Sequence, residues 1–328
     1  MTAFIEDYGV YVPSGRVTSK TVSSLFGKGL PGFKTVSMPE LDEDSLTMGF
    51  EAAKDSVAKI NGKVDAIILA TNSLPFEYKK GSSLLAKMLK IEKAWCLDLG
   101  ASHLASAEAL WLAAQLVDGG KMNRVLVIMS EHPMPQLGEE MDFGWGAGAA
   151  AFLVSSQGFA GLNFLDPDYD MEAYDVWKLR GDNKLRFRPE TLDDNFKQAM
   201  GKFVNSLGGK EALKKYKFMA MSMNRSRWSK VIPGAGITPE QIDSVNCANY
   251  LGHVGTATLG INLALAFDQS VSGDTILGIG YAHGNIVSME IKVDSAPNNL
   301  QLADSLQCGI EKNLADYWQA AYNRRLRS

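Results

Sequence analysis

The stretch that decides the fold runs from Ala94 to Gly120 and reads AWCLDLGASHLASAEALWLAAQLVDGG. It opens on the short apolar run AWCLDL, which is typical of a strand covered on both faces of a sheet. After a turn of small residues, the Ala- and Leu-rich segment SAEALWLAAQLVDGG predicts a buried helix that ends at the glycine pair. A strand followed directly by a buried helix favours an α/β fold.

Similar apolar runs stand on either side of this stretch. VDAIILAT (64–71) precedes it and RVLVIMS (124–130) follows it, so three buried strands are expected in the first half of the chain. The second half repeats this order of elements. Its segments are KFMAMSM (217–223), SVNCANY (244–250), the small-residue helix TATLGINLALAFDQ (256–269) and DTILGIGY (274–281).

The spacing of matched residues indicates an internal duplication. Cys96 and Cys247 are 151 residues apart. His132 and His283, each just past the third strand of its half, are also 151 residues apart. Equal offsets at two separated elements are hard to obtain by chance, so the two halves are expected to share one topology.

Each half closes with one more strand, AGAAAFLVSS (147–156) in the first and NIVSMEIKV (285–293) in the second. We therefore expect two similar halves, residues 1–158 and 159–294, and a C-terminal helical extension, residues 295–328. Alternation of strand and helix predicts a mostly parallel sheet with helices on both faces. Two such halves stacked through their helices would form a five-layer α/β/α/β/α body.

Composition excludes several classes of function. The chain of 328 residues is 46% hydrophobic and 21% charged, with a net charge of -4 and no basic arm, so neither nucleic acid nor an anionic membrane is an expected partner. The N-terminus MTAFIEDYGVYVP does not resemble a signal peptide, and no apolar run is long enough to span a membrane. Three widely spaced cysteines suggest neither a disulfide framework nor a zinc site. We expect a cytoplasmic protein.

Six stretches, in the right order between about Tyr8 and Val293, resemble the HMG-CoA synthases of archaea and bacteria. These enzymes belong to the thiolase superfamily and are related to ketoacyl-ACP synthase III. The stretches are YGVYVPSGRV (8–17), MPELDEDSLTMGFEAA (38–53), NSLPFEYKKGSSLLAKML (72–89), FGWGAGAAAFLVSS (143–156), YDVWKLRGDNKLRFRPE (174–190) and NYLGHVGTATLGINLA (249–264).

The resemblance implies a pocket where the two halves meet. In this family a cysteine at the start of the buried central helix becomes an acylated thiolate, because the helix dipole favours its negative charge. A histidine and an asparagine, or a second histidine, from the second half activate it and polarise the thioester carbonyl. A glutamate from the first half does acid–base work.

This sequence departs from the family pattern at each of these positions. The nucleophile position falls on His103, and the glutamate position falls on Asn72. The segment Met221–Asn224, where the second-half histidine is expected, contains no histidine. The loop asparagine is replaced by His253. The catalytic residues are therefore unknown, and these positions mark only where the family's pocket is expected.

None of the three cysteines stands in for the missing nucleophile. Cys96 lies within a predicted strand, seven residues before the nucleophile position, and is expected to be a buried, inert thiol. Cys247 is its repeat mate and is interpreted in the same way. Cys308 lies in the C-terminal extension, outside the repeats.

Three interpretations of the pocket stay open. In the first, His103, His253 and His283 form a rebuilt catalytic site for acyl transfer or thioester processing, although the sequence shows no carboxylate to orient them. A variant of this interpretation makes Ser102 the nucleophile, but it stands one residue early, which turns its side chain by roughly 100°. In the second, the pocket only binds an acyl-CoA.

In the third interpretation, which we favour, the chain is a non-catalytic subunit. It resembles the cysteine-free, HMG-CoA-synthase-like companions of catalytic thiolase-type subunits, whose assemblies often include a small OB-fold subunit that carries zinc. The C-terminal extension resembles the segment by which such synthases contact their companions. No covalent cofactor is expected, and a coenzyme A thioester is the expected substrate or ligand.

Overall fold

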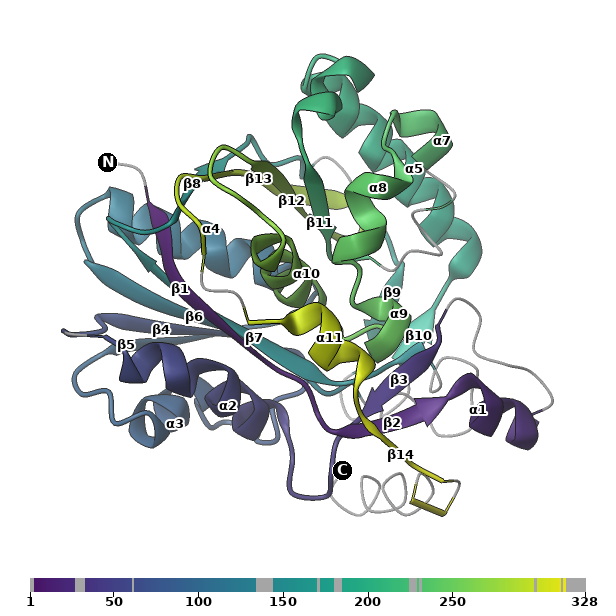
Figure 1. Cartoon of the computed structure of the whole chain (residues 1–328), viewed down its shortest axis with the longest axis horizontal. Helices are drawn as coiled ribbons and strands as arrows, with labels where there is room; N and C mark the ends of the chain where they lie inside the picture. Colours follow the sequence, from purple (N-terminus) through teal and green to yellow (C-terminus); the bar gives the residue numbers. More distant parts are fainter. Residues whose placement is uncertain are drawn as a thin grey trace.

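The computed structural model describes residues 3–26, 33–60, 62–133, 144–169, 172–179, 185–223, 229, 232–297, 300–313 and 315–316. These residues form five layers, with two helical outer layers, two sheet layers and a central pair of helices between the sheets (Figure 1). The expected α/β/α/β/α fold is confirmed. All the strands of the two sheet layers are hydrogen-bonded into one nine-stranded sheet, in the order β11-β12-β13-β8-β1-β7-β6-β4-β5.

The first sheet layer is built from the four apolar runs predicted in the first half of the chain and from β1, which was not predicted from an apolar run. Its strands are β1 (Phe4–Tyr11), β4 (Ala66–Ala70), β5 (Trp95–Leu99), β6 (Arg124–Glu131) and β7 (Gly148–Ser155). The second layer contains β8 (Ala160–Phe164), β11 (Phe218–Met221), β12 (Thr275–Ala282) and β13 (Asn285–Val293). The layers join where β1 pairs with β8 through Phe4 and Gly161.

The prediction of a mostly parallel sheet is wrong. In the described sheet, β4 pairs in parallel with β5 and β6, and β11 with β12, while the other neighbours are antiparallel. The reason is visible at the end of β12, where only His283 and Gly284 separate it from β13. So short a connection allows only an antiparallel hairpin, whereas a parallel pair needs a long crossover.

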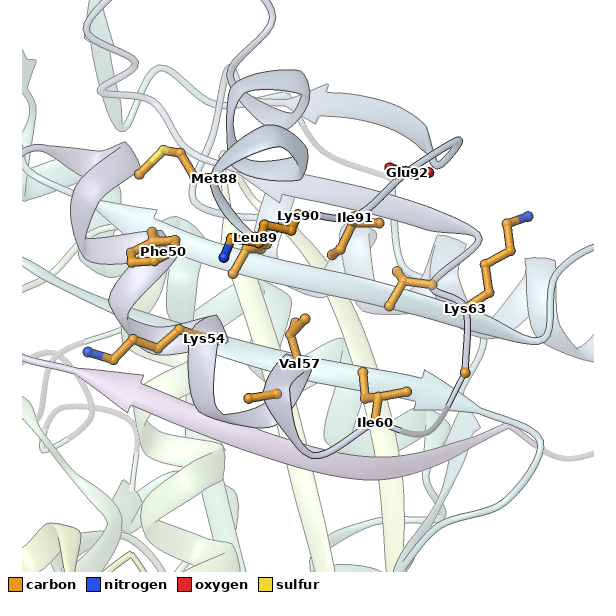
Figure 2. Close-up of a pocket in the computed structure, with 13 residues that line it drawn as sticks. Phe50, Lys54, Val57, Ile60, Lys63, Met88, Leu89, Lys90, Ile91 and Glu92 are labelled. Atoms are coloured by element: carbon orange, nitrogen blue, oxygen red, sulfur yellow. The ribbon is translucent and has the colours of Figure 1, made fainter.

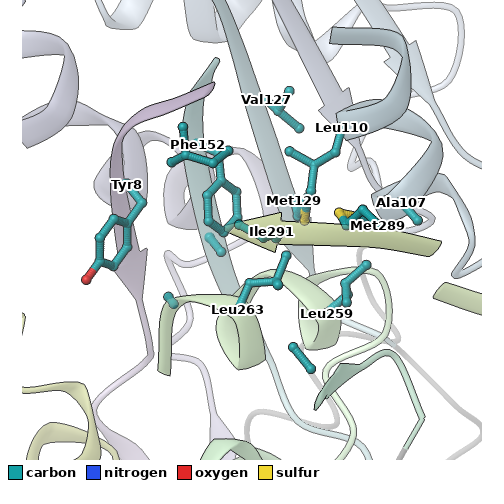
Figure 3. Packing of buried hydrophobic residues seen from close by; sticks show 14 of the residues in the cluster. Tyr8, Ala107, Leu110, Val127, Met129, Phe152, Leu259, Leu263, Met289 and Ile291 are labelled. Atoms are coloured by element: carbon teal, nitrogen blue, oxygen red, sulfur yellow. The ribbon is translucent and has the colours of Figure 1, made fainter. Parts of the chain in front are cut away.

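The central layer consists of α4 (Ala105–Asp118) and α10 (Ala257–Asp268), the two helices predicted from Ala-rich sequence. They pack in one hydrophobic core with residues of both sheet layers, as Figure 3 shows for Leu110, Leu263, Phe152 and Met289. In α10 every residue from Ala257 to Phe267 is buried. A helix that is buried all round needs no polar face, which is why its sequence is apolar or small on every side.

The outer helices cover the two far faces of the sheet. On the first face lie α2 (Ser45–Ala58), which begins with a capping box at Asp44 and Thr47, and α3 (Gly81–Met88). On the second face, α5 (Pro189–Ser206) packs against β11 and β12 in a separate hydrophobic core. The other helices on this side are α7 (Ile232–Ala235), α8 (Pro239–Ile242) and the 3-10 helix η2 (Lys210–Lys215).

Shorter elements complete the chain. A second sheet has the order β14-β2-β3, with strands β14 (Ile310–Glu311), β2 (Gly15–Thr18) and β3 (Thr35–Met38). A hairpin is formed by β9 (Val176–Lys178) and β10 (Leu185–Phe187). The remaining helices are α1 (Ser19–Phe26), η3 (Asp243–Val245), α9 (Ala248–Leu251) and α11 (Leu302–Gln307). None of the described helices has the length and apolar character needed to cross a bilayer.

One further expectation is corrected by the structure. The predicted strand 244–250 is instead the end of η3 followed by most of α9. Here Cys247 N donates to the Asn262 side chain of α10 (2.8 Å), so this backbone amide is satisfied by a helix side chain and not by a neighbouring strand. The described part of the C-terminal extension contains the helix α11 and the short strand β14, and residues 315 and 316 are helical again. Residues 314 and 317–328 lie outside the described residues.

Candidate functional site

The structure brings His103 and His253 together from the two halves of the chain. His103 stands two residues before α4, and its Nδ1 lies 3.4 Å from Nε2 of His253. The other ring nitrogen of His253, Nδ1, lies 3.3 Å from the Thr258 hydroxyl in the first turn of α10. Thr258, His253 and His103 therefore form a chain of polar contacts that ends at the expected nucleophile position.

Trp145 closes one side of this histidine pair. Its ring centroid lies 4.5 Å from that of His253 and 5.4 Å from that of His103. Backbone hydrogen bonds hold the contact, since His253 N donates to Gly144 O (2.8 Å) and Gly146 N donates to His253 O (3.0 Å). Gly252 makes this close approach feasible, because its φ is +71° and a Cβ there would lie 2.8 Å from Gly144 O.

His103 is held as a neutral imidazole. Burial lowers its pKa to about 4, and the nearby charge of His283 acts in the same direction. A neutral imidazole has one donor nitrogen and one acceptor nitrogen, and hydrogen bonding to its partner decides which is which. At neutral pH the His103 ring can thus polarise a carbonyl or accept a proton, but it carries no charge.

A buried carboxylate, Glu131, lies at the end of β6 and was missed by the sequence analysis. Its side chain is 2% exposed. It accepts hydrogen bonds from Asn72 N (3.2 and 3.1 Å) and Asn72 Nδ2 (3.3 Å), from the Thr256 hydroxyl (2.5 Å) and from Thr256 N (3.4 Å). The order of the strands could have indicated this residue. Because β4 and β6 are neighbouring parallel strands, their carboxyl ends lie at one edge of the sheet, so a residue at the end of β6 is expected close to Asn72, which follows β4.

Asn72 connects this carboxylate to the start of α4. Its Nδ2 also contacts the Thr256 hydroxyl (2.9 Å) and the backbone oxygen of Ser102 (3.2 Å). The Ser102 hydroxyl accepts a hydrogen bond from Leu104 N (3.2 Å), which turns it toward the first turn of the helix. The structure therefore gathers Asn72, Ser102 and His103 on one side of the site.

His283 occupies the tight turn between β12 and β13. Its φ is +54°, and its Nδ1 lies 3.0 Å from Ala173 O. The charge of His283 contributes to the lowered pKa of His103, but no described contact joins the two rings directly. In the segment expected to carry a histidine, Met221 is buried and its backbone oxygen accepts from Asn262 Nδ2 (2.8 Å). Asn224 lies outside the described residues.

The three cysteines lie apart from the histidine pair. Cys96 is only partly buried, and not fully buried as expected; it packs against the core under α2 and α3, on the opposite face of the sheet from α4. Cys247 is fully buried, and burial raises the pKa of its thiol to about 12, in agreement with the inert role expected for it. Cys308 is exposed beside β14. Among the described residues, no group of three His, Cys, Asp or Glu side chains is arranged to hold a metal ion.

A separate cavity of about 640 Å³ lies between α2 and α3 on the outer face of the sheet. Figure 2 shows apolar side chains that line it, including Phe50, Val57 and Ile91, together with the lysines Lys54, Lys63 and Lys90. None of the site residues expected from the sequence lines this cavity.

The fold and the geometry of this site define the class of the protein. No protein-family profile matches the chain. It is 25% identical to the hydroxymethylglutaryl-CoA synthase of Aeropyrum pernix over 330 residues, which cover 95% of this chain and 91% of that protein. The structure of the HMG synthase of the curacin biosynthetic pathway superposes with a TM-score of 0.84, at 15% identity, and the match covers 98% of this chain and 88% of the other.

A structure of MvaS in complex with 3-hydroxy-3-methylglutaryl coenzyme A superposes with a TM-score of 0.81, at 16% identity, over 97% of this chain and 91% of that one. The chain is therefore a member of the thiolase-like superfamily. Within it, the chain is an HMG-CoA-synthase-like protein, as its motifs indicated.

Proposed function

We propose that the chain is a non-catalytic, HMG-CoA-synthase-like subunit of an assembly that condenses, cleaves or transfers acyl groups of coenzyme A thioesters. The catalytic cysteine belongs, in this proposal, to a thiolase-type partner chain. A small OB-fold subunit that carries zinc is a further expected component.

The observation that carries this proposal is the environment at the start of α4. A thiolase-type nucleophile needs a thiolate that reaches the pocket. Here the position is filled by a neutral imidazole, His103, which is packed against His253 and Trp145. A neutral imidazole so enclosed does not supply the stable acyl carrier that condensation requires, and each cysteine of the chain lies elsewhere.

The edge of the main sheet supports a partner chain. Strand β5 is the last strand of the sheet, and among the described strands it pairs with β4 alone. Trp95 at its start is 45% exposed, and the rest of the strand is partly exposed, although its residues are mostly apolar. An apolar open edge normally has to be covered. The exposed residues Gly100 and Ala101 follow directly, so a partner on this edge would lie close to His103 along the chain.

A coenzyme A thioester is the expected ligand, because both the sequence relatives and the structural neighbours of the chain suggest it. Relatives of the chain are named hydroxymethylglutaryl-CoA synthase, and one structural neighbour was solved in complex with 3-hydroxy-3-methylglutaryl coenzyme A. A pocket between the two halves can keep the ability to bind a thioester after its nucleophile is lost.

The proposal is tested by purifying the tagged full chain from its own cells and identifying the co-purifying proteins by mass spectrometry. We expect a cysteine-bearing thiolase-type chain. The reconstituted assembly should lose thiolysis of acetoacetyl-CoA when the partner's cysteine is replaced, and keep it in His103→Ala. Turnover of acetyl-CoA or acetoacetyl-CoA by the isolated chain would overturn the proposal.

A matched pair of variants tests the β5 edge. Trp95→Glu places a charge on the proposed contact and should abolish co-purification of the thiolase-type chain. Val271→Glu changes a comparably exposed apolar side chain in the loop before β12 and should leave co-purification unchanged. Equal behaviour of the two variants would argue against this edge as the contact.

A second function, a histidine-based acyltransferase or thioester-processing enzyme, is favoured by the 3.4 Å contact between His103 and His253. In this case His103→Ala and His253→Ala would each abolish turnover by the isolated chain. Ser102→Ala would do so only if the serine were the nucleophile. Tight binding of coenzyme A without turnover, measured by calorimetry, would instead identify an acyl-CoA-binding module.

A further inference from the structure

The β9–β10 hairpin carries an aromatic ring and two cations on one face. In this antiparallel pair Trp177 lies directly opposite Arg186, and residues opposite each other on paired strands point to the same side. Arg188 follows β10, and its guanidinium carbon lies over the Trp177 ring, 5.4 Å from the ring centroid. Trp177 is therefore flanked by two arginines.

Tyr174 extends this face into solvent. It is 67% exposed, and its ring centroid lies 5.9 Å from that of Trp177, with the two rings almost perpendicular (86°). Arg188 is also exposed, and it forms no ion pair with another described residue. We call Tyr174, Trp177, Arg186 and Arg188 the aromatic–arginine patch. The patch presents an open ring and a positive charge to solvent.

The buried carboxylate of Asp175 holds the backbone of this patch in place. Asp175 is 2% exposed, and it accepts hydrogen bonds from the Tyr281 hydroxyl of β12 (2.8 Å) and from Asn195 Nδ2 of α5 (2.8 Å). Its backbone oxygen accepts from Arg188 N (3.1 Å). The carboxylate is thus turned inward, away from a ligand on the patch. A surface fixed in this way loses little freedom when a ligand binds.

The patch lies beside the histidine site. Ala173 N donates to His283 O (3.1 Å), and His283 Nδ1 lies 3.0 Å from Ala173 O. The charge of His283 in turn contributes to the lowered pKa of His103. Tyr174 follows Ala173 directly, so a long ligand held on the patch can extend toward the histidine pair.

An exposed aromatic ring next to a guanidinium suits a base that carries phosphate groups. Bases stack on tyrosine rings, and arginine binds phosphate oxygens through paired N–H donors. A coenzyme A thioester has an adenine base and phosphate groups at the end remote from its thioester. We propose that the aromatic–arginine patch binds this nucleotide end, with Tyr174 stacked on the adenine and Arg188 bound to a phosphate. This inference rests on the proposed coenzyme A ligand, which the subunit and the binding-module interpretations share.

The test is calorimetric titration of the full chain with coenzyme A and with adenosine bisphosphate, a nucleotide fragment that lacks the pantetheine arm. Wild type should bind both. Tyr174→Ala and Arg188→Gln should each weaken the binding of both ligands by about tenfold, because each removes a contact to the nucleotide. Both side chains are exposed, so neither substitution disturbs the core.

Two matched variants serve as controls. Tyr78→Ala removes a tyrosine that is 98% exposed in the loop before α3, and it should leave both affinities unchanged. Lys178→Gln removes a cation from the same hairpin, but Lys178 is one position along β9 from Trp177 and points to the other face, so its effect should be small. Equal weakening by Lys178→Gln and Arg188→Gln would show a general attraction for anions and would overturn the inference.

The remaining outcomes separate this inference from the proposal on which it rests. Equal affinity of wild type and Tyr174→Ala for coenzyme A would overturn the patch as its site and leave coenzyme A as the ligand. No binding of coenzyme A to wild type would overturn both the proposed ligand and the patch.

Discussion

The low pKa of His103 makes the stability of the fold depend on pH in a way that can be measured. In the unfolded chain the histidine takes up a proton near its usual pKa of 6.5, whereas in the folded chain it does so only near 4. Between these two values the unfolded state binds a proton that the native state excludes. Stability contributed by the neutral ring is therefore complete above pH 6.5 and is lost progressively as the pH falls toward 4.

The expected size follows from the same values. Each pKa unit corresponds to about 1.4 kcal/mol, so the whole difference is worth about 3 kcal/mol, of which about 2 kcal/mol is lost by pH 5. The assay is urea unfolding of wild type and His103→Gln at pH 7.5 and pH 5. The free energy of unfolding of wild type should fall by about 2 kcal/mol more than that of the variant.

A second variant separates the two causes of the low pKa. His283→Gln removes the nearby charge that lowers the pKa of His103, but leaves the burial of the ring unchanged. This variant should show a smaller loss of stability at pH 5 than wild type. If wild type and His103→Gln lost the same stability on acidification, the picture of a buried neutral imidazole at this position would be refuted.

Two further substitutions test the framework of the pocket. Glu131→Gln replaces an acceptor oxygen with an amide that donates, although Asn72 and Thr256 already donate to this position. The free energy of unfolding measured by urea titration should therefore fall by about 2 kcal/mol. An unchanged value would show that the carboxylate is not needed for stability. Gly252→Ala should lower the free energy of unfolding by more than about 2 kcal/mol. The new Cβ would lie too close to Gly144 O, and the φ of +71° is strained for alanine. Gly120 has a similar φ of +64°, but no atom lies close to where its Cβ would be. Gly120→Ala should therefore lower the free energy of unfolding by only about 1 kcal/mol, which measures the strain of the backbone without a steric clash. Equal costs in the two glycine variants would contradict the close approach.

Local sequence was sufficient to identify most of the main sheet and both central helices. The apolar runs that became β4, β6 and β12 and the small-residue segment that became α10 are buried almost throughout. The Ala-rich segment that became α4 is buried along most of its length but exposes Trp111 and Gln115. Continuous burial leaves a signal in consecutive residues, which can be read without knowing any partner. The same signal failed at 244–250, where the backbone amide of Cys247 bonds to a side chain of α10, a contact that no local pattern records.

The sequence by itself determined the fold class, the superfamily and the residues at the expected pocket positions, since these follow from short segments and their order. Only the tertiary structure decided how those residues meet. His103 and His253 are 150 positions apart in the chain, and their contact depends on the pairing of Trp145 with the His253 loop. Glu131 likewise became a site residue only when two parallel strands ended side by side. Contacts of this kind are set by the packing of distant segments, which is why sequence patterns name the candidates but not their partners.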